Sequence, residues 1–341
     1  MSEIATNTKL HSRLSTFVGW IKPDSTTREN NKRRADKIRN CVSRKAEEDG
    51  VIVESTPNAG SFATHTGNRR HFRGISEVEG QDIDVPFVVK PESIDGREIK
   101  DLLNRFYRYV DDCYPDSEKK ITKSSVKLMF SDKVNYDLVP MLSTVDSEGQ
   151  IIIRSTGEEI ETSVQRHVRF ILSRNKSSNE IDGKVKFYQC VRLVKWWRDI
   201  QASDGYYLSG DDAPPSFLIN LLCAHAYDRL SVENNYAETL TKWMGFLANE
   251  LKNRKPIMFN DYNNPQVDQS SIWSVIDPVN SDNNVVKNWN STKIDELEGW
   301  FSKSRDNWMR VIRFDDDYED SKSLDYLVKL FGNPFKGHCG D

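Results

Sequence analysis

Three aspartates in two apolar segments constrain the fold of this chain more than any other feature. Asp82 and Asp84 stand one residue apart at the start of an apolar run, and Asp137 lies inside the apolar stretch 134–142. Side chains alternate along a strand, so the first two carboxylates project from one face of it. A third carboxylate on a neighbouring strand would complete a cluster that repels itself unless cations occupy it. The fold is therefore expected to pair these strands in one sheet.

The expected cluster has the chemistry of a magnesium site. Carboxylate oxygens are the ligands that Mg²⁺ takes, and Mg²⁺ normally arrives together with substrate phosphates. The acids therefore predict a two-metal phosphoryl-transfer centre. Two simpler interpretations stay open at this point. Asp82 and Asp84 would also suit a solvated acidic strand or loop, and Asp137 would also suit a structural salt bridge.

A Gly-Ser pair precedes the acids. If Ser61 opens a helix, the exposed N–H groups and the positive dipole end there would hold a triphosphate tail. The hydroxyl would add one more hydrogen bond to a phosphate oxygen. Gly60 and Ser61 taken alone would equally suit an ordinary turn or helix cap, so the interpretation depends on the acids that follow.

Hydrophobic periodicity predicts two lobes. Residues 1–157 read as a catalytic α/β lobe with a long N-terminal helix over 24–48, followed by a small mixed sheet backed by helices. Residues 158–341 read as a helical lobe. Pro86 lacks a donor for a strand ladder, so the strand that carries the acids is expected at an edge or a bulge. The helices expected after residue 157 span 158–173, 184–202, 214–230, 236–251, 291–306 and 320–331.

Composition limits the class of protein. The 341 residues carry 48 Lys and Arg against 52 Asp and Glu, a net charge of −4, so binding to nucleic acid is not expected. No apolar run is long enough to cross a bilayer, and no membrane partner is expected. Five scattered cysteines fit a reducing cytosol better than a disulfide scaffold, and a cytoplasmic location is expected. These cysteines are Cys41, Cys113, Cys190, Cys223 and Cys339.

Taken together, the motifs resemble those of a known family. The pattern is similar to the DNA-polymerase-β-like nucleotidyltransferases, and within them to the bacterial CD-NTases with a SMODS-type catalytic domain, which act in CBASS anti-phage defence. These are relatives of animal cyclic GMP-AMP synthase and oligoadenylate synthase. The resemblance covers roughly residues 20 to 310. It rests on segments 60–63 with Thr66, 82–85, 136–140, 191–197 and 277–285.

The resemblance implies a fold and a set of site residues. The expected fold is α+β, with a polymerase-β-like lobe, a helical second lobe and the active site in the cleft between them. Asp82 and Asp84 would hold both of two Mg²⁺ ions, with Mn²⁺ as an alternative, and Asp137 would complete the ion nearer the attacking hydroxyl. From the second lobe, Lys195 and Ser216 would contact phosphates of the nucleotide. Phe217 would stack on a base. A surface lysine and a core phenylalanine are the open alternatives for Lys195 and Phe217.

The resemblance also implies a reaction. Nucleoside triphosphates, ATP and either GTP or another, would be joined into a cyclic di- or trinucleotide with release of pyrophosphate. The product would act on a separate effector protein. A noncyclising nucleotidyltransferase and a catalytically decayed nucleotide-binding module are the alternatives. The segment 62–81 is longer than in many members, and a lid, a partner contact and a neutral insertion stay open for it.

Overall fold

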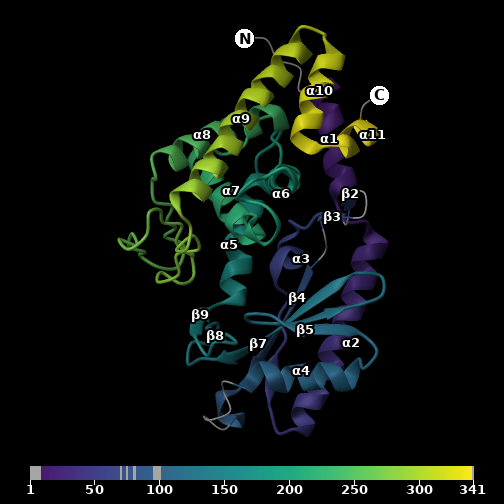
Figure 1. Ribbon diagram of the computed structural model, residues 1–341, viewed down its shortest axis with the longest axis vertical. Coiled ribbons are helices and arrows are strands. Elements are labelled where there is room, and N and C mark those ends of the chain that lie inside the picture. Colours follow the sequence, from purple (N-terminus) through teal and green to yellow (C-terminus); the bar gives the residue numbers. More distant parts are fainter. Residues whose placement is uncertain (1–8, 70, 74–75, 80–81, 95–100, 340–341) are drawn as a thin grey trace. The chain divides into compact units, whose positions relative to one another are not determined.

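The computed structural model describes residues 9–69, 71–73, 76–79, 82–94 and 101–339, with the backbone alone described for 71–73, 76–79 and Asp82. These residues fall into two compact units, and most of their helices and strands are labelled in Figure 1. The sheet unit contains residues 23–67 and 80–169. The helical unit contains residues 1–22, 68–79 and 170–341.

This division differs from the single boundary expected near residue 157. Helix α1 (Lys9–Ile21) belongs to the helical unit because its apolar stripe is buried there. Phe17, for example, is fully buried and its ring contacts those of Trp196 and Phe335. The hairpin of β2 and β3 joins the same unit, and its strands span His71–Arg73 and Ser76–Glu79.

One mixed sheet organises the sheet unit. Its main strand order is β1-β4-β7-β6-β5, and β8 extends it by pairing with both β7 and β9. Among the described strand pairs of this sheet, only β4–β7 is parallel. The strand β9 lies where a helix was expected, because its residues pair with β8. The strands are β1 Val53–Ser55, β4 Asp82–Val89, β5 Glu118–Ile121, β6 Val126–Met129, β7 Asn135–Ser143, β8 Gln150–Ile153 and β9 Glu159–Thr162.

The two faces of the central strands differ in chemistry. Ile83 and Val85 of β4 and Leu138 of β7 are buried in a core shared with helices α2 (Ser25–Glu48) and α4 (Leu102–Cys113). The alternating residues therefore face away from these helices. Asp84 and Asp137 lie on that second face. The strand pattern thus separates an apolar core from the face that carries the two acids.

Helix α2 forms where the sequence predicts it. Asp24 caps its start, accepting a hydrogen bond from the backbone N–H of Thr27 at 2.8 Å. Cys41 of α2 is bonded to Cys113 at the end of α4, with 6.1 Å between their Cα atoms. Scattered thiols were expected instead, and this pair is a correction. The two residues are 72 positions apart, so only the packing of α2 on α4 brings them together.

Pro86 sits on a stretch of β4 that has a partner on one side among the described residues. Strand β1 pairs with β4 at Val88 and Val89, whereas β7 runs beside β4 along its whole length. The missing N–H of Pro86 therefore costs no ladder bond towards β1. The expectation of an edge position holds locally, although β4 lies between two strands in the sheet order.

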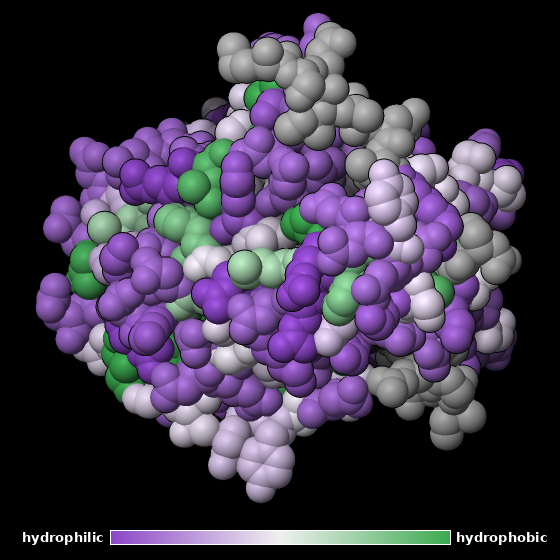
Figure 2. Space-filling view, turned by 90° about the horizontal axis from the view of Figure 1, so that it is seen from above, coloured by the Kyte–Doolittle hydropathy of each residue, from purple (hydrophilic) through white to green (hydrophobic). Residues whose placement is uncertain are grey.

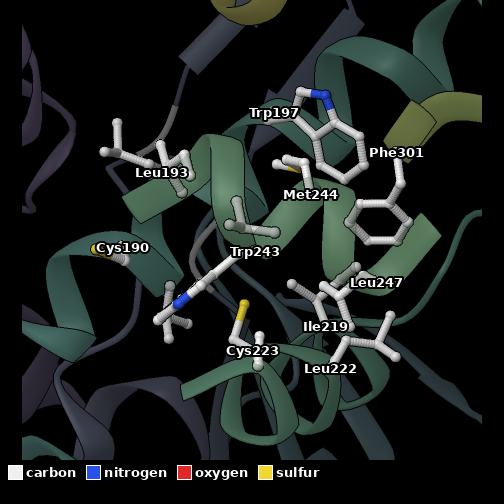
Figure 3. Close-up of a cluster of buried hydrophobic side chains, with 14 of the residues drawn as sticks. Cys190, Leu193, Trp197, Ile219, Leu222, Cys223, Trp243, Met244, Leu247 and Phe301 are labelled. Atoms are coloured by element: carbon white, nitrogen blue, oxygen red, sulfur yellow. The ribbon is translucent and has the colours of Figure 1, made fainter. Parts of the chain in front are cut away.

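The helical unit is built around large aromatic and aliphatic side chains. Figure 3 shows Trp197, Leu222, Leu247 and Phe301 meeting from four different helices. The helices expected near 184, 214, 236, 291 and 320 are all present, while α1 and α11 were not expected and α9 is longer than expected. Their bounds, with α5 at the junction of the units, are α5 Val164–Asn179, α6 Phe187–Ser203, α7 Ser216–Leu230, α8 Tyr236–Lys252, α9 Ser291–Asp316, α10 Asp320–Phe331 and α11 Asn333–Cys339.

The face of the molecule shown in Figure 2 is mostly polar. On the face shown in Figure 2, hydrophobic residues appear singly or in small groups among hydrophilic ones, which is ordinary for a folded protein. None of the helices in the described part of the chain combines the length and the apolar character needed to span a membrane.

Candidate active site

Two of the three predicted acids are direct neighbours in the sheet. Asp84 of β4 is in register with Asp137 of β7 across the parallel pair. Paired strands lie about 4.8 Å apart, and side chains of residues in register project from the same face. Both aspartates are half-buried. The fold therefore places two carboxylates side by side on the face opposite the core.

Two residues of the neighbouring strand region hold the carboxylate of Asp137. Ser125 donates its hydroxyl to Oδ1 at 2.9 Å, and the Nζ of Lys127 lies 3.5 Å from Oδ2. Lys127 is also the register partner of Asp137 across β6 and β7. Sequence reasoning missed both residues. Their alternation in Ser125-Val126-Lys127 carried a signal, but its meaning depends on a long-range register.

The third acid is placed by its backbone alone. Asp82 occupies the first position of β4, in register with Asn135, and its side chain lies outside the described side chains. Within the described part of the chain, no three His, Cys, Asp or Glu side chains gather closely enough to hold a metal ion. The oxygen donors of Asp84 and Asp137 are nevertheless of the kind that suits Mg²⁺. Their adjacency fits such an ion, and a role for Asp82 as a third ligand stays a prediction.

Gly60 lies against the carboxylate of Asp84. Its φ is +59°, and a Cβ added to it would stand 1.8 Å from Oδ2 of Asp84. Both the backbone angle and the close approach require glycine here. The sequence signal at Gly60 therefore has a physical cause. The backbone at Gly60 therefore lies directly beside the carboxylate of Asp84.

Helix α3 (Gly60–Thr64) begins one residue earlier than expected, so Ser61 is its second residue. A single turn adds little dipole, yet the N–H groups of a first turn have no partner within the helix. Gly67 also packs closely on this turn, because a Cβ there would stand 3.1 Å from the hydroxyl oxygen of Ser61. Glycines thus flank Ser61 in space, and its predicted phosphate contact stays a prediction.

The other three predicted residues belong to the helical unit. Lys195 of α6 is buried, with 1% of its surface exposed, so the surface interpretation is wrong. Burial raises the pKa of the nearby Cys223 thiol to about 12, against the opposing effect of the Lys195 charge. Ser216 opens α7, and its hydroxyl accepts a hydrogen bond from Arg198 at 3.3 Å. Phe217 is half-buried and packs on the hydrophobic core. Contacts of these residues with a nucleotide stay predictions.

Comparison with known proteins now identifies the family. Residues 8–175 match the model of the Second Messenger Oligonucleotide or Dinucleotide Synthetase domain, SMODS. The chain belongs to the SMODS-containing CD-NTases. The resemblance inferred from the motifs is thereby confirmed. The SMODS match includes Gly60, Ser61 and all three predicted acids, and it ends before Lys195.

Known proteins are similar to this chain over most of its length. The cyclic AMP-AMP-AMP synthase of Escherichia coli strain MS 115-1 is 27% identical over 267 residues, covering 75% of this chain and 78% of the relative. The structure of E. coli MS115-1 CdnC with ATP superposes with a TM-score of 0.77 at 21% identity, covering 97% and 99% of the two chains. The Bradyrhizobium diazoefficiens CD-NTase CdnG with GTP gives 0.70 at 14% identity, covering 96% of each. The expected polymerase-β-like fold is confirmed.

The motif at 277–285, beyond the SMODS match, forms the inside of a folded loop. Asp277 is buried, and its carboxylate accepts hydrogen bonds from the N–H of Val279 and the side chain of Asn283. Asn284 is buried too, with its side-chain oxygen accepting from the N–H of Val275 and its nitrogen donating to a backbone carbonyl. These contacts give the motif a structural role.

The long segment after Ser61 is anchored in the helical unit at its start. Asn68 is buried and donates to the carbonyl of Arg192 at 3.1 Å. Arg69 donates to the carbonyl of Trp20 and places its guanidinium 4.8 Å from the centre of that ring. Arg70 lies outside the described residues. The three interpretations of segment 62–81, a lid, a partner contact and a neutral insertion, therefore stay open, while Asn68 and Arg69 have structural partners.

Proposed function

We propose that this SMODS protein joins nucleoside triphosphates into a cyclic oligonucleotide second messenger, with release of pyrophosphate, and that the product acts on a separate effector in anti-phage defence. The observation that carries the proposal is the adjacency of Asp84 and Asp137 in register, with the backbone of Gly60 against Asp84. Family membership supports the same reaction class.

The acids would hold divalent ions, Mg²⁺ or Mn²⁺. When bound there, such ions would lower the pKa of the attacking ribose hydroxyl and neutralise the departing phosphates. Ser125 and Lys127 would orient the Asp137 carboxylate towards that hydroxyl, since both contact it directly. Asp137 would then receive the hydroxyl proton as the new phosphodiester bond forms.

The α3 turn would hold the donor phosphates. Glycine at position 60 lets backbone N–H groups approach a phosphate beside the acids, and the hydroxyl of Ser61 supplies one more donor. From the helical unit, Lys195 and Ser216 would contribute phosphate contacts and Phe217 a stacking surface for a base. Positioning and charge stabilisation supply most of the acceleration in this chemistry.

ATP is the first substrate to test. The relative with 27% identity is a cyclic AMP-AMP-AMP synthase, and the solved structure with a TM-score of 0.77 contains ATP. Purified protein is incubated with ATP, GTP, CTP and UTP, singly and mixed, with Mg²⁺ or Mn²⁺. Released pyrophosphate and nucleotide products are then measured. The expected product is resistant to phosphatase, because a ring has no terminal phosphate.

Two outcomes would contradict the proposal. A linear, phosphatase-sensitive product would identify a noncyclising nucleotidyltransferase. Absence of pyrophosphate under every combination of triphosphate and ion would leave only a nucleotide-binding module. The variant Asp84→Asn serves as the inactive control in both cases, because it removes one carboxylate while preserving side-chain size.

A further inference from the structure

Two arginines of α2 contact the segment that carries Gly60 and Ser61. Arg28 and Arg39 are eleven residues apart, which corresponds to three helical turns at 3.6 residues per turn. They consequently lie on nearly the same face of α2, separated by about 16 Å along its axis at 1.5 Å per residue. This spacing lets one helix contact both ends of a short segment.

Arg39 contacts the residue before the glycine turn. Its Nη2 donates to the side-chain oxygen of Asn58 at 3.0 Å, two residues before Gly60. Its Nη1 donates to Asp36 at 2.8 Å, one turn back on α2. The Arg39 side chain is only 11% exposed. The guanidinium is therefore fixed from its own helix while it holds Asn58.

Arg28 contacts the residue after the turn. Its Nη2 lies 2.6 Å from Nδ1 of His65, and because a guanidinium can only donate, the imidazole accepts. The same guanidinium lies 5.3 Å from the centre of the Phe62 ring. His65 ends α3 with a φ of 61°, a left-handed conformation that costs energy outside glycine. Arg28 thus supports the position where the backbone leaves the turn.

The turn is also tied internally. The hydroxyl of Thr64 donates to the carbonyl of Gly60 at 3.1 Å and lies 2.9 Å from the hydroxyl of Thr66. The N–H of Thr66 donates to the carbonyl of Ser61 at 3.1 Å. These bonds make residues 60–66 a compact unit. Holding its two ends on α2 therefore fixes where the whole turn stands against Asp84.

We propose that Arg28 and Arg39 are positioning residues for nucleotidyl transfer, which together hold the segment 58–65 in place so that Gly60 and Ser61 meet the donor triphosphate. The inference rests on the proposed function. It assigns to α2 a role in the reaction besides packing on the sheet. Neither arginine is placed in contact with the reacting atoms.

The kinetic test uses Arg28→Gln and Arg39→Gln with Arg44→Gln as matched control. Arg44 is an exposed arginine of the same helix, and it contacts Cys41 and Glu48. The KM for ATP with Mg²⁺ is expected to rise about tenfold in the first two variants, the effect of losing one charge-assisted hydrogen bond. The kcat is expected to stay within about threefold of the wild type, and the control to leave both constants unchanged.

Conservative variants separate positioning from general destabilisation. Asn58→Asp keeps an acceptor for Arg39, whereas Asn58→Ala removes it. His65→Asn keeps an acceptor for Arg28 and tolerates the left-handed conformation, whereas His65→Ala does neither. Each acceptor-keeping variant is expected to retain a KM within about threefold of the wild type, and each alanine variant to match the corresponding arginine variant. The double variant with Arg39→Gln and Asn58→Ala is expected to have nearly the same KM as Asn58→Ala alone.

Hydrogen exchange tests, without any substrate, whether Arg28 and Arg39 hold the segment 58–65 in place. Amide exchange in segment 58–65 is expected to accelerate about tenfold in the two arginine variants and not in Arg44→Gln. If the wild type is active and all three variants show the same KM and exchange, the positioning role is refuted while the proposed function stands. If the wild type is inactive with every triphosphate, the proposed function fails, and exchange alone decides whether the two arginines hold the turn.

Discussion

The two units of this molecule differ in how charged side chains are arranged within them. In the sheet unit, Asp84 and Asp137 put like charges side by side, with Lys127 near one of them. In the helical unit, several buried charges have partners of opposite sign. Arg174, for example, is only 8% exposed and donates to both Asp228 and Asp261.

This contrast separates a working site from a structural one. Two adjacent carboxylates repel each other, so they lower the stability of the folded chain unless a cation joins them. A buried arginine between two carboxylates is already compensated, and removing it leaves charges without a partner. Substitution of Asp84 or Asp137 should therefore affect catalysis, and substitution of Arg174 should affect folding.

The largest effect is expected from Asp84→Asn or Asp137→Asn. Pyrophosphate release should fall at least about a thousandfold, because the carboxylates act on charge that develops in the transition state. The free energy of unfolding should stay constant or rise, since repulsion between the two acids is relieved. Asp112→Asn, an exposed acid of α4, is the control. A variant that lost stability and activity in proportion would place the acids among structural residues.

The converse is expected for Arg174→Met. Its guanidinium also donates to the carbonyl of Phe170 at 2.8 Å, so the substitution breaks contacts with three partners. The free energy of unfolding should fall by about 3 kcal/mol, as for other broken buried ion pairs. Below the melting transition, kcat per folded molecule should change little. Arg174→Lys should be intermediate, because lysine keeps the charge and loses the forked geometry. Denaturant unfolding with parallel rate measurements checks both parts.

Gly60→Ala is expected to have a smaller effect on both the activity and the free energy of unfolding. A positive φ costs a residue with a side chain about 1–2 kcal/mol, and the new methyl group would displace the Asp84 carboxylate. Activity should fall about thirtyfold, or roughly 2 kcal/mol in barrier height. Gly50→Ala is the matched control, because Gly50 has φ +77° and nothing within 4 Å of the added Cβ. Equal loss of activity in both variants would attribute the effect to backbone strain alone.

Sequence reasoning succeeded where a local pattern carries its own cause. The apolar segments around Asp84 and Asp137 predicted two neighbouring strands of one sheet, and the parallel register confirms that the two acids are neighbours. The helix over 24–48 was predicted from its cap and its stripe, and Asp24 does cap it. Gly60 was singled out beside the acids, and its contact with Asp84 gives the physical reason.

What failed depended on how strands pair and how helices pack. The segment 159–162 resembled the start of a helix, but pairing with β8 makes it a strand. The bond between Cys41 and Cys113 depends on how α2 packs on α4. Lys127 meets Asp137 only through the register of β6 and β7. The local pattern of the residues concerned does not specify any of these contacts by itself.

The smallest expected effect concerns pH and the helical unit. Burial lowers the pKa of His225, against the opposing effect of its hydrogen bond with Glu250 at 3.1 Å. Because the folded pKa is depressed, the unfolded chain binds the proton more readily, and stability falls as pH drops below about 6.5 towards the folded pKa. Unfolding free energy should therefore decrease by roughly 1 kcal/mol between pH 7 and pH 5. His11, whose pKa is also lowered by burial, contributes with the same sign.

His225→Gln should flatten part of this slope, because glutamine can still donate to Glu250 but does not titrate. His11 contributes part of the remaining slope, which should decrease further in the double variant. Denaturant unfolding at half-unit steps of pH measures both. A slope of opposite sign in the wild type would mean that the charged imidazole is favoured beside Glu250. The helical unit would then contain a buried ion pair between His225 and Glu250. Opposite charges would stabilise each other there as they do around Arg174.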